Sequence, residues 1–238
     1  ETGPSVGMKP SPAGLVEAVA HELEQGFHRI KIKVAPGKDD EYIQAVRTAF
    51  PAVSLMVDAN SAYHPADLAR LAEWDQYNLL MIEQPFNEHD LHYHAQLCAR
   101  MTTPVCLDES IETPHLADCA MKMHAADIVN IKVCRVGGLT HTLRIHDLCA
   151  KHQIPVWIGS RLGSGVATAA RLAAASLPNA SFPTDAGAER AYVADDLLTT
   201  PLETRNGCEL RVPSAPGLGI EVDRARLAAC TTHQETQT

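Results

Sequence analysis

Short apolar runs and longer amphipathic segments alternate along most of the chain. Eight runs, several of them rich in β-branched residues, are predicted to be strands: 5–8, 29–34, 53–58, 79–83, 105–108, 128–132, 155–159 and 181–185. Seven segments with helical periodicity or helix-capping signals are predicted to be helices: 12–25, 39–49, 65–76, 88–101, 114–123, 138–152 and 164–177. This alternation predicts an α/β protein with a parallel sheet.

The predicted strands favour a closed barrel over an open sheet. They are apolar at nearly every position, which is typical of parallel strands that are buried on both faces. Eight strands are enough to close a barrel. A doubly wound sheet would place a GxGxxG turn after its first strand, and the chain has no such turn. A period near 25 also fits leucine-rich repeats, but their LxxLxLxxN pattern does not occur.

Composition narrows the function classes. The 238 residues carry 20 Lys and Arg against 29 Asp and Glu, a formal net charge of −9, so we expect no nucleic-acid partner. No apolar run approaches the roughly 18 residues that a membrane span needs, so we expect no membrane partner. The seven cysteines are scattered singly without a CxxC pair. That pattern argues against a disulfide framework and predicts a cytoplasmic protein.

Charged residues recur at the predicted strand ends. Lys33, Asp58, Glu83, Asp108 and Lys132 follow one another in steps of 25, 25, 25 and 24 residues. The C-terminal ends of barrel strands form the active-site mouth in this architecture. Each repeat of the chain is therefore predicted to deliver one charged group to the same mouth.

The three acids of this series predict a metal site. Asp58, Glu83 and Asp108 end successive strands, and neighbouring strands lie about 4.8 Å apart. Three converging carboxylates repel one another unless a cation lies between them. All-oxygen ligands favour a hard ion, so we expect Mg²⁺, with Mn²⁺ as the alternative. A single acid would be read as a solvated loop residue, but the regular spacing argues against that for all three.

The lysines add acid–base chemistry. Lys31 and Lys33 lie two apart and share a strand face, and Lys132 ends the sixth strand, opposite the second in an eight-stranded barrel. A lysine near another cation has a lowered pKa and can act as a base. The set predicts removal of the proton α to the carboxylate of a small metal-bound substrate. The proton then returns on the other face, or a β-leaving group departs.

The ordered motifs resemble the enolase superfamily, in particular the o-succinylbenzoate synthase and N-acylamino acid racemase family of its muconate-lactonising subgroup. The matching motifs are Lys-x-Lys at 31–33, Asp-Ala-Asn at 58–60, Glu-Gln-Pro at 83–85, Asp-Glu-Ser at 108–110, and Asn-Ile-Lys at 130–132 followed by Arg-Val-Gly-Gly-Leu at 135–139. The resemblance implies a (β/α)₇β barrel, a homo-oligomer and one Mg²⁺ on the three acids. It implies general acid and base roles for Lys33 and Lys132.

The same resemblance assigns supporting roles. Lys31, Asn60 and Glu109 are expected beside the metal and the bases, and Ser5 at the substrate pocket. The seventh-strand region departs from the family, because Arg161 and Gly163 stand where Met and Glu are usual, and Val133-Cys134 replaces Pro-Gly after the sixth strand. We expect Gly159, Ser160 and Arg161 to line the substrate site, where Arg161 could pair with a carboxylate.

Three parts are predicted along the chain: a catalytic barrel at 1–206, a segment at 207–228 that packs on a capping domain, and a disordered tail at 229–238. The family carries an N-terminal capping domain, whereas this chain begins at its first predicted strand, so we expect the cap elsewhere in the same protein. Three functions stay open: o-succinylbenzoate synthase of menaquinone biosynthesis with N-acylamino acid racemase activity, a dipeptide epimerase or other racemase, and a barrel that binds without turnover.

Overall fold

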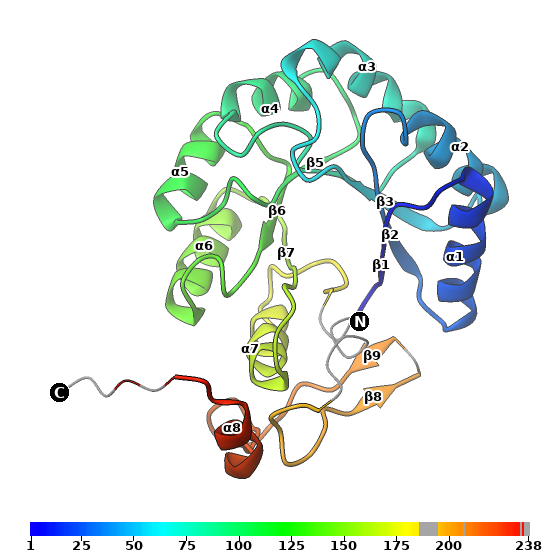
Figure 1. Ribbon diagram of the computed structural model, residues 1–238. Coiled ribbons are helices and arrows are strands. Elements are labelled where there is room, and N and C mark those ends of the chain that lie inside the picture. The colour runs from blue at the N-terminus through cyan, green and yellow to red at the C-terminus, as the bar shows by residue number, and fades with distance from the viewer. Residues whose placement is uncertain (186–194, 207, 234, 236–238) are drawn as a thin grey trace.

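The chain forms a curled parallel sheet surrounded by helices in a computed structural model that describes residues 1–185, 195–206, 208–233 and 235 (Figure 1). The seven strands pair in chain order, all parallel. They are β1 (Ser5–Val6), β2 (Arg29–Lys33), β3 (Ser54–Asp58), β4 (Ile82–Glu83), β5 (Val105–Leu107), β6 (Ile128–Ile131) and β7 (Val156–Ile158). Each falls within a predicted run, and the architecture is the predicted (β/α)₇β barrel.

A helix follows each strand and lies on the outside of the sheet (Figure 1). The helices are α1 (Pro12–Glu24), α2 (Asp40–Ala49), α3 (Leu68–Ala72), α4 (Leu91–Cys98), α5 (Pro114–Lys122), α6 (Leu139–Lys151) and α7 (Gly165–Ala175). Capping side chains begin several of them, as Ser11 does by accepting from the backbone N–H of Gly14 at 3.2 Å. The predicted helix 65–76 is instead a succession of η1 (Pro65–Asp67), α3 and η2 (Glu73–Tyr77).

The eighth barrel position differs from the predicted strand 181–185. No regular strand forms there, and single parallel bridges connect Thr184 to Thr2 and Ala180 to Val156. The backbone N–H of Gly3 donates to the oxygen of Thr184 at 2.9 Å, which joins this segment to the start of the chain. The segment therefore closes the barrel between β7 and β1 with a few bonds rather than a ladder.

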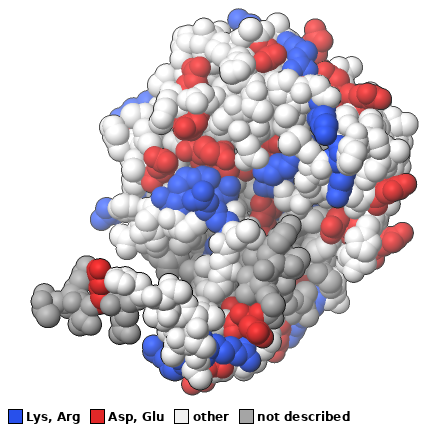
Figure 2. Space-filling model, viewed as in Figure 1, with Lys and Arg blue, Asp and Glu red and all other residues white. Residues whose placement is uncertain are grey.

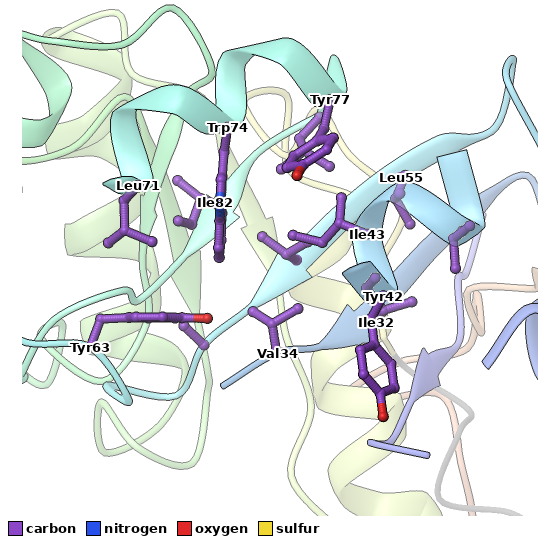
Figure 3. Close-up of a cluster of buried hydrophobic side chains, with 14 of the residues drawn as sticks. Ile32, Val34, Tyr42, Ile43, Leu55, Tyr63, Leu71, Trp74, Tyr77 and Ile82 are labelled. Carbon is purple, nitrogen blue, oxygen red and sulfur yellow. The ribbon is translucent and has the colours of Figure 1, made fainter. Parts of the chain in front are cut away.

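Alternate residues of each strand face two different environments. The outward positions are aliphatic, such as Ile32 and Leu55, and pack under the helices together with Trp74 and Tyr77 (Figure 3). A separate cluster forms from Met56, Met81, Cys106, Ile128 and Trp157, which alternate along their strands with the outward residues. The inward residues nearer the strand ends are the charged ones. This arrangement explains why the strands read as continuously apolar except at their ends.

The C-terminal part packs beside α7 and the N-terminus (Figure 1). It contains the antiparallel pair β8 (Thr204–Arg205) and β9 (Glu209–Leu210), then α8 (Arg224–Cys230). Helix α8 thus includes the first two residues of the predicted tail, whose residues 234 and 236–238 lie outside the described part. None of the helices described is both long and apolar enough to cross a membrane.

Candidate active site

Lys33 and Lys132 lie at one height on opposite walls of the barrel. The strand register runs from Lys33 to Asp58, Glu83, Cys106 and finally Ile128, which is four residues before Lys132. In an eight-stranded barrel of shear about 8 the register shifts about one residue per strand, about four over four strands. The offset therefore compensates the tilt of the strands and brings both lysines to the same mouth.

Lys33 forms hydrogen bonds with two residues at the C-terminal end of β3. Its Nζ donates to Asp58 Oδ2 at 2.6 Å and to the side-chain oxygen of Asn60. Asn60 in turn donates from Nδ2 to Glu109 Oε1 at 3.0 Å. Burial, with Asp108 nearby, raises the pKa of Glu109, and its Oε2 is buried without a partner among the described atoms. The structure thus brings these four predicted residues into one connected group.

Lys31 lies deeper and contacts three carboxylates. Its Nζ is 2.7 Å from Asp185 Oδ2, 3.3 Å from Glu83 Oε2 and 3.5 Å from Asp58 Oδ2. Burial lowers the pKa of Lys31, but the three carboxylates outweigh burial and leave it well above its usual value. Arg29 holds the other oxygen of Asp185 at 2.8 Å. The contacts of Lys31 therefore favour its charged form.

Lys132 and Arg135 share Asp108. Lys132 Nζ lies 2.5 Å from Asp108 Oδ2, and Arg135 Nη1 donates to the other carboxylate oxygen and to the backbone oxygen at 2.6 Å. Burial lowers the pKa of Lys132, but Asp108 and Glu83 outweigh it and raise the pKa above its usual value. The pKa of Lys132 is therefore raised in this arrangement because a buried carboxylate contacts the ammonium group directly.

Glu83 is a fully buried acid at the end of β4. Asn130 donates from Nδ2 to Glu83 Oε1 at 2.6 Å, opposite the contact with Lys31. Burial raises the pKa of Glu83, and the nearby Asp58 adds to the effect. Asn130 fills the space beside Gly159, where a Cβ would lie 2.8 Å from the Asn130 Cγ. Gly159 is thus the position at which the seventh strand leaves room for this amide.

The remaining predicted substrate residues lie around the mouth. Ser5 is the register partner of Lys31 and is exposed. Ser160 is half-buried and Arg161 is exposed, both just beyond the end of β7. Around the middle of the face seen in Figure 2, basic and acidic side chains adjoin one another. The mouth is thus charged with both signs.

Asp58, Glu83 and Asp108 do not form a ready-made ligand set. Among the residues described, no three His, Cys, Asp or Glu side chains are grouped so that they could hold a metal ion. Lysine and arginine groups lie on the carboxylate oxygens instead, as Lys33 does on Asp58 and Lys132 on Asp108. The donors are nevertheless all oxygens, and burial, together with the negative charges of Asp58 and Asp108, raises the pKa of Glu83. This donor chemistry suits a hard divalent cation.

Several residues of this network were missed from the sequence, among them Asp185, Arg135 and Asn130. Asp185 is the acid at the end of the predicted eighth strand, so the strand-end rule applied to the other acids also points to it. Arg135 follows Lys132 by three residues, and Asn130 precedes it by two and thus shares its strand face. Asn130 could have been found from the sequence because it is a polar residue within an otherwise apolar strand.

The chain is similar in sequence and in fold to known proteins of one superfamily. Residues 14–226 match the family model "Enolase C-terminal domain-like". The chain is 45% identical over 97% of its length to o-succinylbenzoate synthase of Geobacillus kaustophilus, covering 61% of that protein. It is 45% identical over 92% of its length to N-succinylamino acid racemase of Amycolatopsis sp, covering 59%. A solved enolase superfamily member from Listeria innocua superposes with a TM-score of 0.91 at 38% identity, covering 96% of this chain and 62% of that one.

These matches agree in fold and in sequence over nearly the whole chain. The chain spans about three fifths of the length of the curated relatives it matches. With the family model covering most of its residues and a barrel that carries the expected charged strand ends, the chain belongs to the enolase C-terminal domain-like family of the enolase superfamily.

Proposed function

We propose that this chain is the catalytic barrel of an o-succinylbenzoate synthase that also racemises N-succinylamino acids. The observation that carries the proposal is the placement of Lys33 and Lys132 at one height on opposite walls, with Asp58, Glu83 and Asp108 between them. The two relatives at 45% identity carry these two activities in their names. Both activities begin with loss of a proton α to a carboxylate, so one pair of bases serves both.

Asp58, Glu83 and Asp108 are the residues that would hold Mg²⁺, or Mn²⁺ in its place. When bound, the cation supplies positive charge beside the substrate carboxylate, which acidifies the α-proton. Lys33 and Lys132 contact Asp58 and Asp108, two of the acids that would hold the cation. Lys31 is in addition paired with Asp185, which lies outside that ligand set.

The lysines perform the proton transfers. In racemisation, one lysine Nζ takes the α-proton as the C–H bond breaks, and the ammonium on the opposite wall donates a proton to the other face. In dehydration, the same proton is lost to one lysine while the β-hydroxyl leaves as water with a proton from an ammonium group. Asn60 orients Lys33 through its side-chain oxygen. Ser5, Gly159, Ser160 and Arg161 border the mouth and are the proposed substrate contacts.

The test is Mg²⁺-dependent chemistry at the α-carbon. The chain, with any further segment that its gene encodes, is incubated with N-succinyl amino acids in D₂O and followed by proton NMR. Dehydration of the hydroxy-acid precursor to o-succinylbenzoate is followed by ultraviolet absorbance. We expect both reactions, and addition of EDTA abolishes them. Absence of exchange and of dehydration under all conditions would contradict the proposal, and exchange confined to dipeptides would indicate an epimerase. Self-association, a capping domain and a cytoplasmic location stay predictions.

A further inference from the structure

Gln84 is a fully buried residue at the exit of β4, and its side chain makes four hydrogen bonds. The side-chain Oε1 accepts from the backbone N–H of Asp108 at 2.8 Å and of Ser110 at 3.2 Å. The side-chain Nε2 donates to Ser110 Oγ at 2.8 Å and to the backbone oxygen of Phe86 at 3.1 Å. Both ends of the amide are thus fully used, and neither contacts solvent.

The side chain of Gln84 takes over a bond that the backbone would make in a continuing sheet. The backbone N–H of Gln84 donates to the oxygen of Cys106 at 2.8 Å, the last step of the β4–β5 ladder. In a regular parallel ladder, the N–H of Asp108 would next donate to the backbone oxygen of Gln84. That oxygen instead accepts from Ser61 at 2.8 Å, because Gln84 adopts a left-handed φ of 40°. The side-chain Oε1 supplies the missing acceptor.

One residue therefore connects three strand exits. The backbone oxygen of Gln84 accepts a hydrogen bond from Ser61, which follows Asp58 and Asn60 at the exit of β3. Gln84 itself directly follows Glu83 in the chain. Its side chain holds the peptide of Asp108 at the exit of β5. We propose that Gln84 is a positioning residue that fixes the relative placement of Asp58, Glu83 and Asp108 for the divalent cation. This inference rests on the metal site of the proposed function.

If Gln84 had only a structural role, its mutation would lower the stability of the protein without lowering its affinity for the metal. Loss of a buried side-chain hydrogen bond lowers stability wherever it occurs. Loss of a residue that orients metal ligands also lowers metal affinity, by about 10- to 100-fold in characterised sites. Metal affinity therefore separates the two roles, and it is measured without substrate turnover.

The experiment is calorimetric titration of Mg²⁺ into the wild-type chain, Gln84→Met and Gln84→Asn. Methionine keeps the side-chain length but has no amide, and asparagine is one methylene too short to reach Asp108. The control is Asn179→Leu, which removes a side-chain bond to the oxygen of Ile154, just before β7 at the other end of the barrel. Circular dichroism confirms that each variant is folded, and its melting temperature is recorded. If one Gln84 variant fails to fold, the other decides the question.

We expect both Gln84 variants to raise the Kd for Mg²⁺ by about 10-fold or more, and Asn179→Leu to leave it within about threefold although it too lowers the melting temperature. A wild-type Kd in a folded Gln84 variant would overturn the positioning role while leaving the proposed function intact. Absence of Mg²⁺ binding in the wild-type chain would instead overturn the metal site itself. The two failures are therefore distinguishable.

Discussion

Lys33 ends β2 and Lys132 directly follows β6, four strands further around the barrel, and the strand register places Lys132 four residues beyond the position aligned with Lys33. The tilt of the strands accounts for that offset. Lys33 contacts Asp58 at the end of the next strand. Lys132 contacts Asp108 at the end of the preceding strand. Two proton-transfer groups on opposite walls, each beside a carboxylate, are the feature on which the functional account depends.

Gly159 is expected to tolerate no side chain. A Cβ there would lie 2.8 Å from the Cγ of Asn130, which is itself fixed on Glu83. Gly159→Ala should therefore lower the free energy of unfolding by about 1–3 kcal/mol through overpacking. The control is Gly7→Ala, because no atom lies within 4 Å of a Cβ at Gly7, and we expect a change within about 0.5 kcal/mol. Urea unfolding measures both, and equal stability of the two variants would contradict the packing argument.

His94 is expected to make the stability of the protein depend on pH. Burial lowers the pKa of His94 to about 4, and its Nε2 accepts from the backbone N–H of Phe86 at 3.3 Å. An unfolded histidine has a pKa of about 6.5, so the unfolded chain takes up the proton first as the pH falls. This contribution is fully present above about pH 6.5 and declines toward pH 4, by at most about 3 kcal/mol.

The measurement for His94 is urea unfolding at several values between pH 7.5 and pH 4.5. The amide introduced by His94→Gln does not titrate, so the stability of this variant should fall less steeply with acid than that of the wild type. The exposed His89 provides the control His89→Gln, which should keep the wild-type slope. Parallel curves for the wild type and His94→Gln would show that His94 is not the group responsible.

Asp185 is expected to be needed for barrel stability. Burial alone would raise its pKa, but Lys31 and Arg29 bring it down to about 2. Asp185→Asn leaves these two buried cations with a neutral neighbour, which should cost about 3–5 kcal/mol at pH 7. The unfolded carboxyl has a pKa of about 3.9, so the wild-type advantage is complete above that pH and shrinks as the pH falls toward 2.

Chemical unfolding of the wild type and Asp185→Asn at pH 7 and pH 3.5 checks this expectation. The matched control is Asp118→Asn, which removes the exposed ion pair with Lys122 and should cost less than about 1 kcal/mol. A similarly small loss for Asp185→Asn would mean that the buried ion pair contributes little to closing the barrel.

The sequence was sufficient to predict the barrel and most of its charged mouth, because both depend on local signals. Apolar runs repeat at a nearly constant period, and a charged residue ends each of five strands. The contacts between those residues could not be predicted in the same way. Lys31 and Asp185 are 154 residues apart in sequence, and their pairing depends on closure of the barrel.

The pattern of charged strand ends also did not predict in which direction the pKa of Lys132 is shifted. A nearby cation or burial lowers the pKa of a lysine, but contact with Asp108 reverses the effect for Lys132. The turn at Gln84 was likewise not predictable, because its left-handed backbone and its bonds to Ser61 and Asp108 depend on three strand exits at once. The helix expected at 65–76 is a succession of the 3-10 helix η1, the α-helix α3 and the 3-10 helix η2, and the sequence periodicity did not distinguish these from one continuous α-helix.

The most direct test of the account is α-proton exchange of the two enantiomers of one N-succinyl amino acid in D₂O with Mg²⁺, followed by NMR. Arginine keeps the positive charge but cannot serve as a base at neutral pH, so the variants are Lys33→Arg and Lys132→Arg, with the exposed Lys122→Arg as control. We predict that the wild type and the control exchange both enantiomers. Each active-site variant should lose exchange of a different enantiomer by about 100-fold or more. Loss of the same enantiomer in both variants, or wild-type exchange in either, would contradict two bases on opposite walls.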